Sequence, residues 1–316
     1  MRTPIIPFLL AFIFSQAFAQ EGGGFQEVLR LEEEGKHKKA LDVIDKLIEE
    51  EPGRAFYYTQ KALIQGNMGK IDVAFETLED ATNMFPDSLL IYDMHGGLYA
   101  RMNLFNRAQE IYQKAYVRAR NPEDKAAYLI MIGGLLNGKR SFKEAKKALE
   151  RAIMLDSTNL NAYNNLAHCL KEMGQEEEAM TQLKRVIEVD PNYIPGYINI
   201  GYVLHEEGHY MEALGYLDRA IMIDSSFAYA FSNRSFCKLM LGDLDGALQD
   251  IDHSLEMDVA NSYGYKIRAK VYLAMGKKKA ACKELEEAIS WGYTRQYGNE
   301  VQMLLGEYCE KKGKRK

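Results

Sequence analysis

Apolar residues recur along the chain in a register set by alanine. Successive alanines lie 34 residues apart, with one interval of 37, at Ala40, Ala74, Ala108, Ala145, Ala179, Ala213, Ala247 and Ala281. A large residue follows each alanine by four positions, and a mostly small residue follows it by seven. These offsets place side chains on one face of an α-helix. The pattern therefore predicts eight amphipathic helices, one around each alanine.

A second helix is predicted ahead of each alanine. The residue twelve positions before it is mostly small, as at Ala62, Gly96 and Gly201, and the residue sixteen positions before it is usually aromatic. Five positions before it, six of the eight repeats carry a glycine, which allows the left-handed backbone that ends a helix. Small residues let two helices approach closely, and large residues fill the gaps between neighbours. Each repeat is therefore expected to be a helical hairpin.

The repeats differ from one another at a few positions. Asn103 and Arg140 replace the turn glycine in the third and fourth repeats, and Gly24 replaces the aromatic residue in the first. The three extra residues of the long interval fall near 121–124. We expect them in the loop between the third and fourth repeats, with a local change of superhelical twist.

The repeat pattern stops after Ala288. The segment that follows is expected to form one capping helix, with Val301, Leu304 and Tyr308 on one side. A stack of hairpins needs such a cap with a polar outer face. The predicted organisation is a flexible N-terminus at 20–24, eight repeats over 25–292, a capping helix over 293–311 and a basic tail at 312–316, all in one continuous domain.

These columns resemble the tetratricopeptide repeat family. The stretch Ala162-Tyr163-Asn164-Asn165-Leu166-Ala167, followed by Gly174, Ala179 and Asp190-Pro191, matches the family motif. The resemblance covers residues 21–292 and implies an all-α, right-handed solenoid of eight tetratricopeptide hairpins. It also implies that the chain binds other polypeptides.

The first 19 residues have the features of a secretory signal peptide. Arg2 gives a short basic region, an apolar stretch follows from Ile5 to Phe14, and Ala17-Phe18-Ala19 is a typical cleavage site. The apolar stretch is too short to span a bilayer as a retained helix. We therefore expect cleavage after Ala19 and a secreted or periplasmic protein that does not insert into the membrane. The leader and the C-terminal ending resemble secreted tetratricopeptide proteins of Bacteroidetes-type bacteria.

The overall charge excludes little except a nucleic-acid partner. The chain carries 40 basic and 45 acidic residues, a net charge of −5. Loss of Arg2 with the leader leaves 39 basic against 45 acidic residues, a net charge of −6. Such a mild and mixed balance is not typical of a nucleic-acid-binding protein. The basic run at the C-terminus is expected to be a solvated tail.

Four cysteines follow the leader, with a spacing unlike that of a zinc site. Cys282 lies early in the last repeat helix and Cys309 at the end of the capping helix, so antiparallel neighbours would bring them together. A disulfide forms there if the Cα atoms lie within about 7 Å, and an oxidising compartment would preserve it. Cys169 and Cys237 hold one column two repeats apart and are expected to be buried apolar residues outside any disulfide.

One segment matches a zinc metallopeptidase pattern. His205-Glu206-Glu207-Gly208-His209 fits H-E-x-x-H, in which both histidines must lie one turn apart on a continuous helix. Gly208 is the turn glycine of its repeat, so His209 is expected outside the helix of His205. A zinc-dependent hydrolase is therefore the alternative function. No phosphate-binding or dinucleotide-binding glycine motif is present, and neither a cofactor nor catalysis is expected.

Asparagine recurs fourteen positions before the repeat alanine, at Asn165, Asn199 and Asn233. The family places this column on a concave groove, where amides can bind the backbone of an extended peptide. The alternative is that these asparagines support the local fold. The other residues expected to line the groove are Asn161, Asn164, His168, Tyr202, His205, Tyr229, Phe236, Lys266 and Lys270. For the aromatic residues, contact with the next repeat is the alternative.

The sequence therefore predicts a non-catalytic scaffold of the periplasm or cell envelope. Its expected partner is a protein or an extended peptide. Self-association through the end repeats is a further form of the same activity.

Overall fold

The computed structural model describes residues 23–309, and every regular element in that range is helical. The expected signal peptide and the basic tail lie outside the described residues. Contacts divide the chain into two compact units, the first of which ends at Ser157 and the second of which begins at Thr158. Within the described range, no helix is both long and apolar enough to span a membrane.

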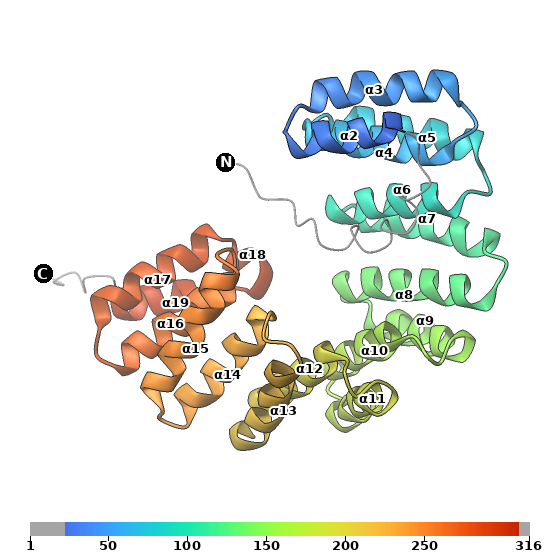
Figure 1. Cartoon of the computed structure of the whole chain (residues 1–316). Coiled ribbons are helices and arrows are strands. Elements are labelled where there is room, and N and C mark those ends of the chain that lie inside the picture. The colour runs from blue at the N-terminus through green and yellow to red at the C-terminus, as the bar shows by residue number, and fades with distance from the viewer. Residues whose placement is uncertain (1–22, 310–316) are drawn as a thin grey trace, which may run out of the picture. The chain divides into compact units, whose positions relative to one another are not determined.

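Each unit contains four antiparallel helical hairpins in chain order (Figure 1). The first unit contains α2 (Gly23–Glu33) with α3 (His37–Glu50), α4 (Ala55–Asn67) with α5 (Ile71–Met84), α6 (Leu89–Arg101) with α7 (Phe105–Arg118), and α8 (Pro122–Gly138) with α9 (Phe142–Leu155). The second unit contains α10 (Leu160–Glu172) with α11 (Glu176–Val189), α12 (Ile194–Glu206) with α13 (Tyr210–Ile223), α14 (Ala228–Met240) with α15 (Leu244–Met257), and α16 (Ser262–Ala274) with α17 (Lys278–Ser290). The predicted hairpin solenoid is confirmed.

The two helices of a hairpin meet through the predicted columns of small and large residues. All eight register alanines are completely buried. A Cβ atom built on Gly201 of α12 would lie 2.7 Å from Cγ of Leu217 in α13. At Gly96 of α6, it would overlap the ring of Tyr112 in α7. Small residues at this column therefore set how closely the helices of one hairpin approach.

The turn between the two helices keeps a left-handed backbone in every repeat. The six turn glycines have φ angles between 69° and 87°. Asn103 and Arg140, which replace glycine, have φ angles of 58° and 59°. All eight turns thus have the same backbone geometry, although a left-handed backbone is unfavourable for Asn103 and Arg140.

The aromatic column connects each hairpin to the loop before it. The hydroxyl of Tyr197 donates to the carbonyl of Pro191, six residues earlier, at 3.0 Å. Tyr92 donates in the same way to Pro86 at 2.9 Å. Each bond satisfies a loop carbonyl and fixes the entry into the first helix.

The three extra residues of the long interval do not lie in a loop. They lengthen α8, which has 17 residues where α6 and α10 have 13. Asn121 accepts a hydrogen bond from the backbone N–H of Asp124 at 2.7 Å, and Pro122 occupies the first turn. An N-cap followed by proline starts a helix efficiently, so the insertion is helical.

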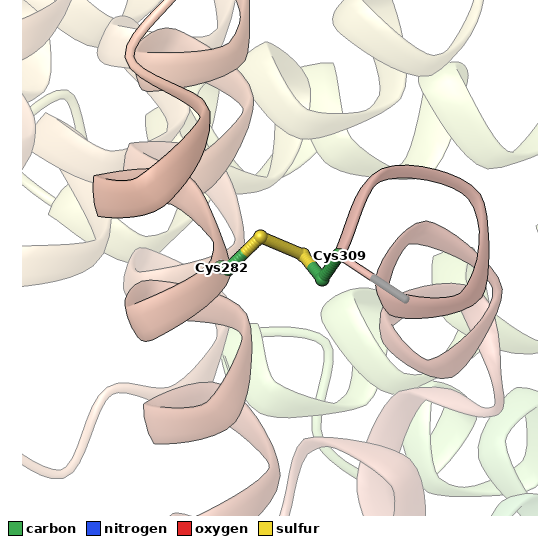
Figure 2. Close-up of a disulfide and its surroundings, with 2 residues drawn as sticks. All are labelled: Cys282 and Cys309. Atoms are coloured by element: carbon green, nitrogen blue, oxygen red, sulfur yellow. A yellow bond between two sulfur atoms is a disulfide. The ribbon is translucent and has the colours of Figure 1, made fainter. Parts of the chain in front are cut away.

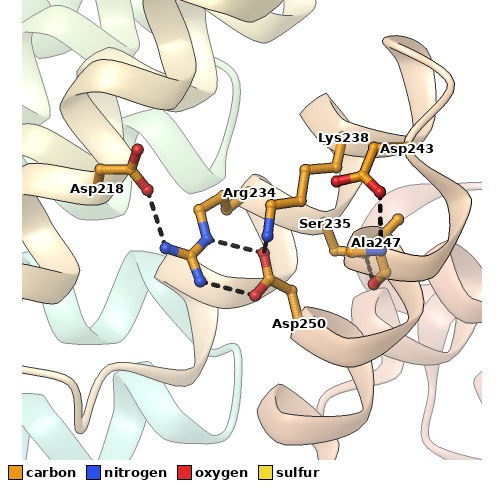
Figure 3. A network of polar contacts seen from close by, with 8 residues as sticks. Asp218, Arg234, Ser235, Lys238, Asp243, Ala247 and Asp250 are labelled. Atoms are coloured by element: carbon orange, nitrogen blue, oxygen red, sulfur yellow. Dashed lines mark hydrogen bonds and ion pairs between the residues drawn. The ribbon is translucent and has the colours of Figure 1, made fainter.

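In the second unit, arginines bridge successive hairpins, and Figure 3 shows this for Arg234. Arg234 of α14 binds both carboxylate oxygens of Asp250 in α15, each at 2.7 Å. It also donates to Asp218 of α13 at 2.8 Å. One repeat later, Arg268 donates twice to Oε2 of Glu284 in α17, at 2.9 and 2.7 Å, and once to Asp252 of α15 at 2.9 Å. Bidentate pairing of a partly buried arginine stabilises the stack more than an exposed ion pair would.

The segment after the last hairpin differs from the single helix expected. It forms α18 (Tyr293–Tyr297), α19 (Glu300–Leu304) and the π-helical turn η2 (Leu305–Cys309). The break falls at Gly298, whose φ angle is 91°, outside the range of a right-handed helix. All three pieces contact α17, so the segment covers the last hairpin as a cap.

A disulfide holds this cap to the repeats (Figure 2). It joins Cys282 of α17 to Cys309 of η2, the pair expected from the sequence, with the Cα atoms 5.7 Å apart. Cys169 and Cys237 are buried and form no disulfide.

Candidate functional site

The first helices of the hairpins form one continuous surface in the second unit. α12 contacts α14, and α14 contacts α16. α10 joins α12 through a hydrogen bond from Asn199 Nδ2 to Asn164 Oδ1 at 3.1 Å. We call the surface of α10, α12, α14 and α16 the first-helix face. All twelve residues expected to line a groove lie in these four helices.

A chain of side chains crosses this face. The Nζ atom of Lys171 lies 4.2 Å from the ring centre of Tyr202. Tyr202 meets His205 edge-on at 4.9 Å between ring centres, and His205 lies 4.9 Å from Phe236. Lys270 places its Nζ atom 5.7 Å from the ring centre of Phe236. Side chains of all four helices are therefore in contact.

Three tyrosine rings of this region are open to solvent. Tyr202, Tyr229 and Tyr297 have 37%, 46% and 41% of their surface exposed. Burial raises the pKa of Tyr202 and of Tyr297 to about 12, and the charges of Tyr229 and Tyr202 add to the shift at Tyr297. The hydroxyls therefore stay protonated near neutral pH, and each ring offers apolar area with a hydrogen-bonding group at its tip.

The two lysines bind a carboxylate of the chain itself. Lys270 Nζ lies 2.6 Å from Glu300 Oε1, and Lys266 Nζ lies 3.2 Å from Glu300 Oε2. The hydroxyl of Tyr293 donates to the same Oε2 atom at 3.1 Å. Partial burial raises the Glu300 pKa, but the hydrogen bond from Lys270 and the charge of Lys266 outweigh it and lower the pKa to about 2. The cap therefore pairs with the two lysines of α16, at one end of the first-helix face.

The asparagines divide between structural and exposed roles. Asn164 and Asn199 bond each other, and Asn161 accepts a hydrogen bond from the Tyr193 hydroxyl at 3.0 Å. Asn233 is 5% exposed. The bond between Asn164 and Asn199 and the burial of Asn233 favour support of the local fold for these three residues. Asn161 keeps an exposed side chain at the start of α10.

The H-E-x-x-H segment does not assemble zinc ligands. His205 is 2% exposed, enclosed by the rings of α12 and α14, with Nε2 3.2 Å from Glu206 Oε1. His209 lies beyond the end of α12, in the turn that follows Gly208. Over residues 23–309, no group of three His, Cys, Asp or Glu side chains is arranged to hold a metal ion. The geometry thus gives the hydrolase alternative no support.

Sequence reasoning missed two residues that complete this surface. Lys171 stands eight positions before Ala179, the column that His205 holds in the next repeat, so the register could have identified it. Glu300 lies after the repeats end, where no column exists to point to it. His168 is exposed on α10, but it is not one of the side chains in contact between Lys171 and Lys270.

Comparison with known proteins agrees with the hairpin architecture. Three family models described as tetratricopeptide repeat match residues 136–197, 183–215 and 267–291. No curated protein matches the chain.

Solved structures share the fold at low sequence identity. A tetratricopeptide repeat protein from Parabacteroides merdae is 18% identical with a TM-score of 0.55, over 90% of this chain and 99% of that one. Yeast Tom70 is 14% identical with a TM-score of 0.65, over 86% of this chain and 58% of that one. TTC0263 of Thermus thermophilus is 18% identical with a TM-score of 0.51, over 58% of this chain and 98% of that one.

Proposed function

We infer from these matches that the chain belongs to the tetratricopeptide repeat family, and we propose that it binds an extended polypeptide segment on the first-helix face of its second unit. The fold is that of a protein-interaction scaffold, and repeat proteins of this family are generally non-catalytic. We propose the same for this chain.

One observation carries the proposal. The contact chain from Lys171 through Tyr202, His205 and Phe236 to Lys270 links four successive repeats and fixes the aromatic side chains of the middle two. Rings that are already held rigid lose little conformational entropy when a partner binds. Exposed tyrosines combine apolar contact with hydrogen bonding, which is why they are common in protein interfaces.

We further propose that the protein acts outside the cytoplasm, secreted or in the periplasm. The leader-like segment at 1–19 supports this location. The disulfide between Cys282 and Cys309 supports it as well, because such bonds persist in oxidising compartments. Mass spectrometry of the protein from its native cell should find Gln20 at the N-terminus. An intact leader would contradict this location.

The binding proposal is tested with paired variants of the mature chain. Immobilised wild type is compared with Tyr202→Ala/Tyr229→Ala and with Met211→Ala/Met222→Ala, which changes exposed residues of α13 instead. We expect the tyrosine variant to recover at least about tenfold less partner polypeptide from envelope extract, since buried aromatic contacts dominate such interfaces. The methionine variant should match the wild type.

Circular dichroism and melting curves show whether both variants are folded. Equal partner recovery by the wild type and a folded tyrosine variant would reject the first-helix face as the binding surface. Recovery of the chain itself as the partner would instead identify self-association at this face.

A further inference from the structure

The first unit contains an apolar pocket between its second and third hairpins. The pocket has a volume of about 300 Å³ and lies between α4, α5 and α6. Its walls include Leu63, Met94 and Leu98, and it reaches Leu78, a completely buried residue of α5. An apolar cavity of about 150 Å³ is enough to bind benzene, so this pocket has room for a chain of several methylene groups.

The pocket is bordered by a position that has no side chain. Gly66 of α4 borders it, and a Cβ atom built there would meet no atom within 4 Å. In the sixth repeat the same column holds His205, whose ring fills the space beside Tyr202. Glycine inside a helix costs about 1 kcal/mol relative to alanine, and an unfilled space forfeits dispersion contacts. The fold alone therefore gives no reason for this glycine.

One positively charged side chain lines the pocket. Arg101, the last residue of α6, lines it and forms no ion pair with any residue between 23 and 309. Asn67 also lines it, and its amide donates to Glu32 at 2.8 Å. The Glu32 carboxylate is further engaged by His37 at 2.7 Å. The guanidinium of Arg101 is thus the group available to an anion, and its planar fork matches a carboxylate.

We propose that this pocket binds a medium-length aliphatic carboxylate. The hydrocarbon chain lies against Leu63, Met94 and Leu98, and the carboxylate pairs with Arg101. A mostly apolar cavity with one placed polar group is the usual form of a small-molecule site. This site belongs to the first unit and does not depend on polypeptide binding by the second.

Two methionines at the pocket provide a direct readout. In protein labelled with ¹³C at the methionine ε-methyl groups, decanoate should shift the resonances of Met94 and Met102, which line the pocket. Met154 and Met222 are 86% and 73% exposed and far from it in sequence, so they report non-specific binding. Shifts at all four methionines alike, or at none, would overturn the proposal.

The chemical class is tested with decanol and with Arg101→Gln. Decanol has the same chain without the charge, and we expect it to bind about tenfold more weakly than decanoate. Arg101→Gln should weaken decanoate by a similar factor and leave decanol unchanged. Equal affinity of wild type for the two compounds would contradict pairing with Arg101.

The location is tested at Gly66. Gly66→Leu should fill the pocket and abolish the decanoate-induced shifts at Met94 and Met102. Gly66→Ala has the same helix-favouring effect but fills little space, so it should bind decanoate like the wild type. Decanoate binding by Gly66→Leu at wild-type affinity would place the ligand elsewhere. If Gly66→Leu does not fold, the comparison of decanoate with decanol in the wild type decides the proposal.

Discussion

At the scale of single residues, the hairpins depend on places where a neighbouring helix leaves no room for a side chain. Gly96 and Gly97 are adjacent in α6 but differ in this respect. A Cβ atom at Gly96 would overlap the buried ring of Tyr112, whereas at Gly97 it would reach only the Tyr112 hydroxyl, at 3.8 Å. The same substitution should therefore have opposite effects at the two positions.

We predict that Gly96→Ala destabilises the first unit by about 1–3 kcal/mol, because an overpacked core must shift. Gly97→Ala should stabilise it by up to about 1 kcal/mol, because alanine favours the helix. Urea unfolding followed by circular dichroism measures both. A stabilising Gly96→Ala would show that Tyr112 does not limit the approach of α6 and α7.

A second residue-scale prediction concerns His95 of α6. It is 4% exposed, and burial lowers its pKa from the ordinary 6.5 to about 4, with a smaller effect from the charge of Lys114. The unfolded chain takes up a proton below pH 6.5, but the folded chain does so only near pH 4. Stability should therefore fall by about 3 kcal/mol as the pH falls from 6.5 to 4.

His95→Phe should remove that part of the pH dependence. The difference in unfolding free energy between wild type and variant, measured at steps from pH 7 to pH 4, should change across this window. A difference that stays constant from pH 7 to pH 4 would mean that His95 titrates normally in the folded protein.

At the scale of elements, the turn of the fourth hairpin has a left-handed backbone at a residue that is not glycine. Arg140 has a φ angle of 59°, which costs an L-residue about 1–2 kcal/mol. Its guanidinium lies 5.4 Å from the ring centre of Phe142, and this cation–π contact stabilises the turn by about 0.5–1 kcal/mol. Glycine should therefore be more stable there.

We predict that Arg140→Gly raises the unfolding free energy of the first unit by up to about 1 kcal/mol. Arg140→Ala keeps the strained backbone and loses the ring contact, so it should lower that free energy. Thermal and urea unfolding distinguish the two variants. The reverse order would show that contacts of the arginine, and not backbone strain, determine the stability of this turn.

The helical hairpins could be predicted from the sequence because their contacts recur at fixed offsets. Gly201 and Leu217 meet within one hairpin beside the buried Ala213, and every repeat has an alanine, a mostly small residue and a large residue at these three offsets. The break at Gly298 was missed because a single glycine outside the register does not reveal its backbone angle. The helical insertion at Asn121-Pro122 was also missed, although an N-cap followed by proline is a recognisable start.

The site was harder to predict than the fold. The register placed Tyr202, His205 and Phe236 on one face, and they do touch. It did not show that Lys266 and Lys270 are engaged by Glu300, since that contact comes from a segment without repeats. It did not show the bond between Asn164 and Asn199 either, because this depends on side-chain orientation.

At the scale of the whole molecule, we predict that the disulfide is needed to keep the cap packed on the last hairpin. Cys282 and Cys309 close a loop with a sequence separation of 27. A cross-link of that length stabilises by about 3–4 kcal/mol in the chain-entropy estimate. Cys282→Ser/Cys309→Ser should therefore destabilise the second unit, with faster amide hydrogen exchange in α18 and α19.

The same variant should leave hydrogen exchange in the first unit unchanged. Cys169→Ala is the matched control, because that buried cysteine forms no disulfide. Unchanged exchange in the cap of the double serine variant would show that Glu300 and the apolar contacts hold the cap without the cross-link.

Photo-crosslinking in the native cell can show whether a partner polypeptide lies on the first-helix face. A photoreactive benzoylphenylalanine is placed at Tyr202 or Tyr229, and at Met211 or Met222 of α13 for comparison. We expect a crosslinked polypeptide from both tyrosine positions and none from the methionine positions. Adducts from α13 alone, or from all four positions equally, would contradict it.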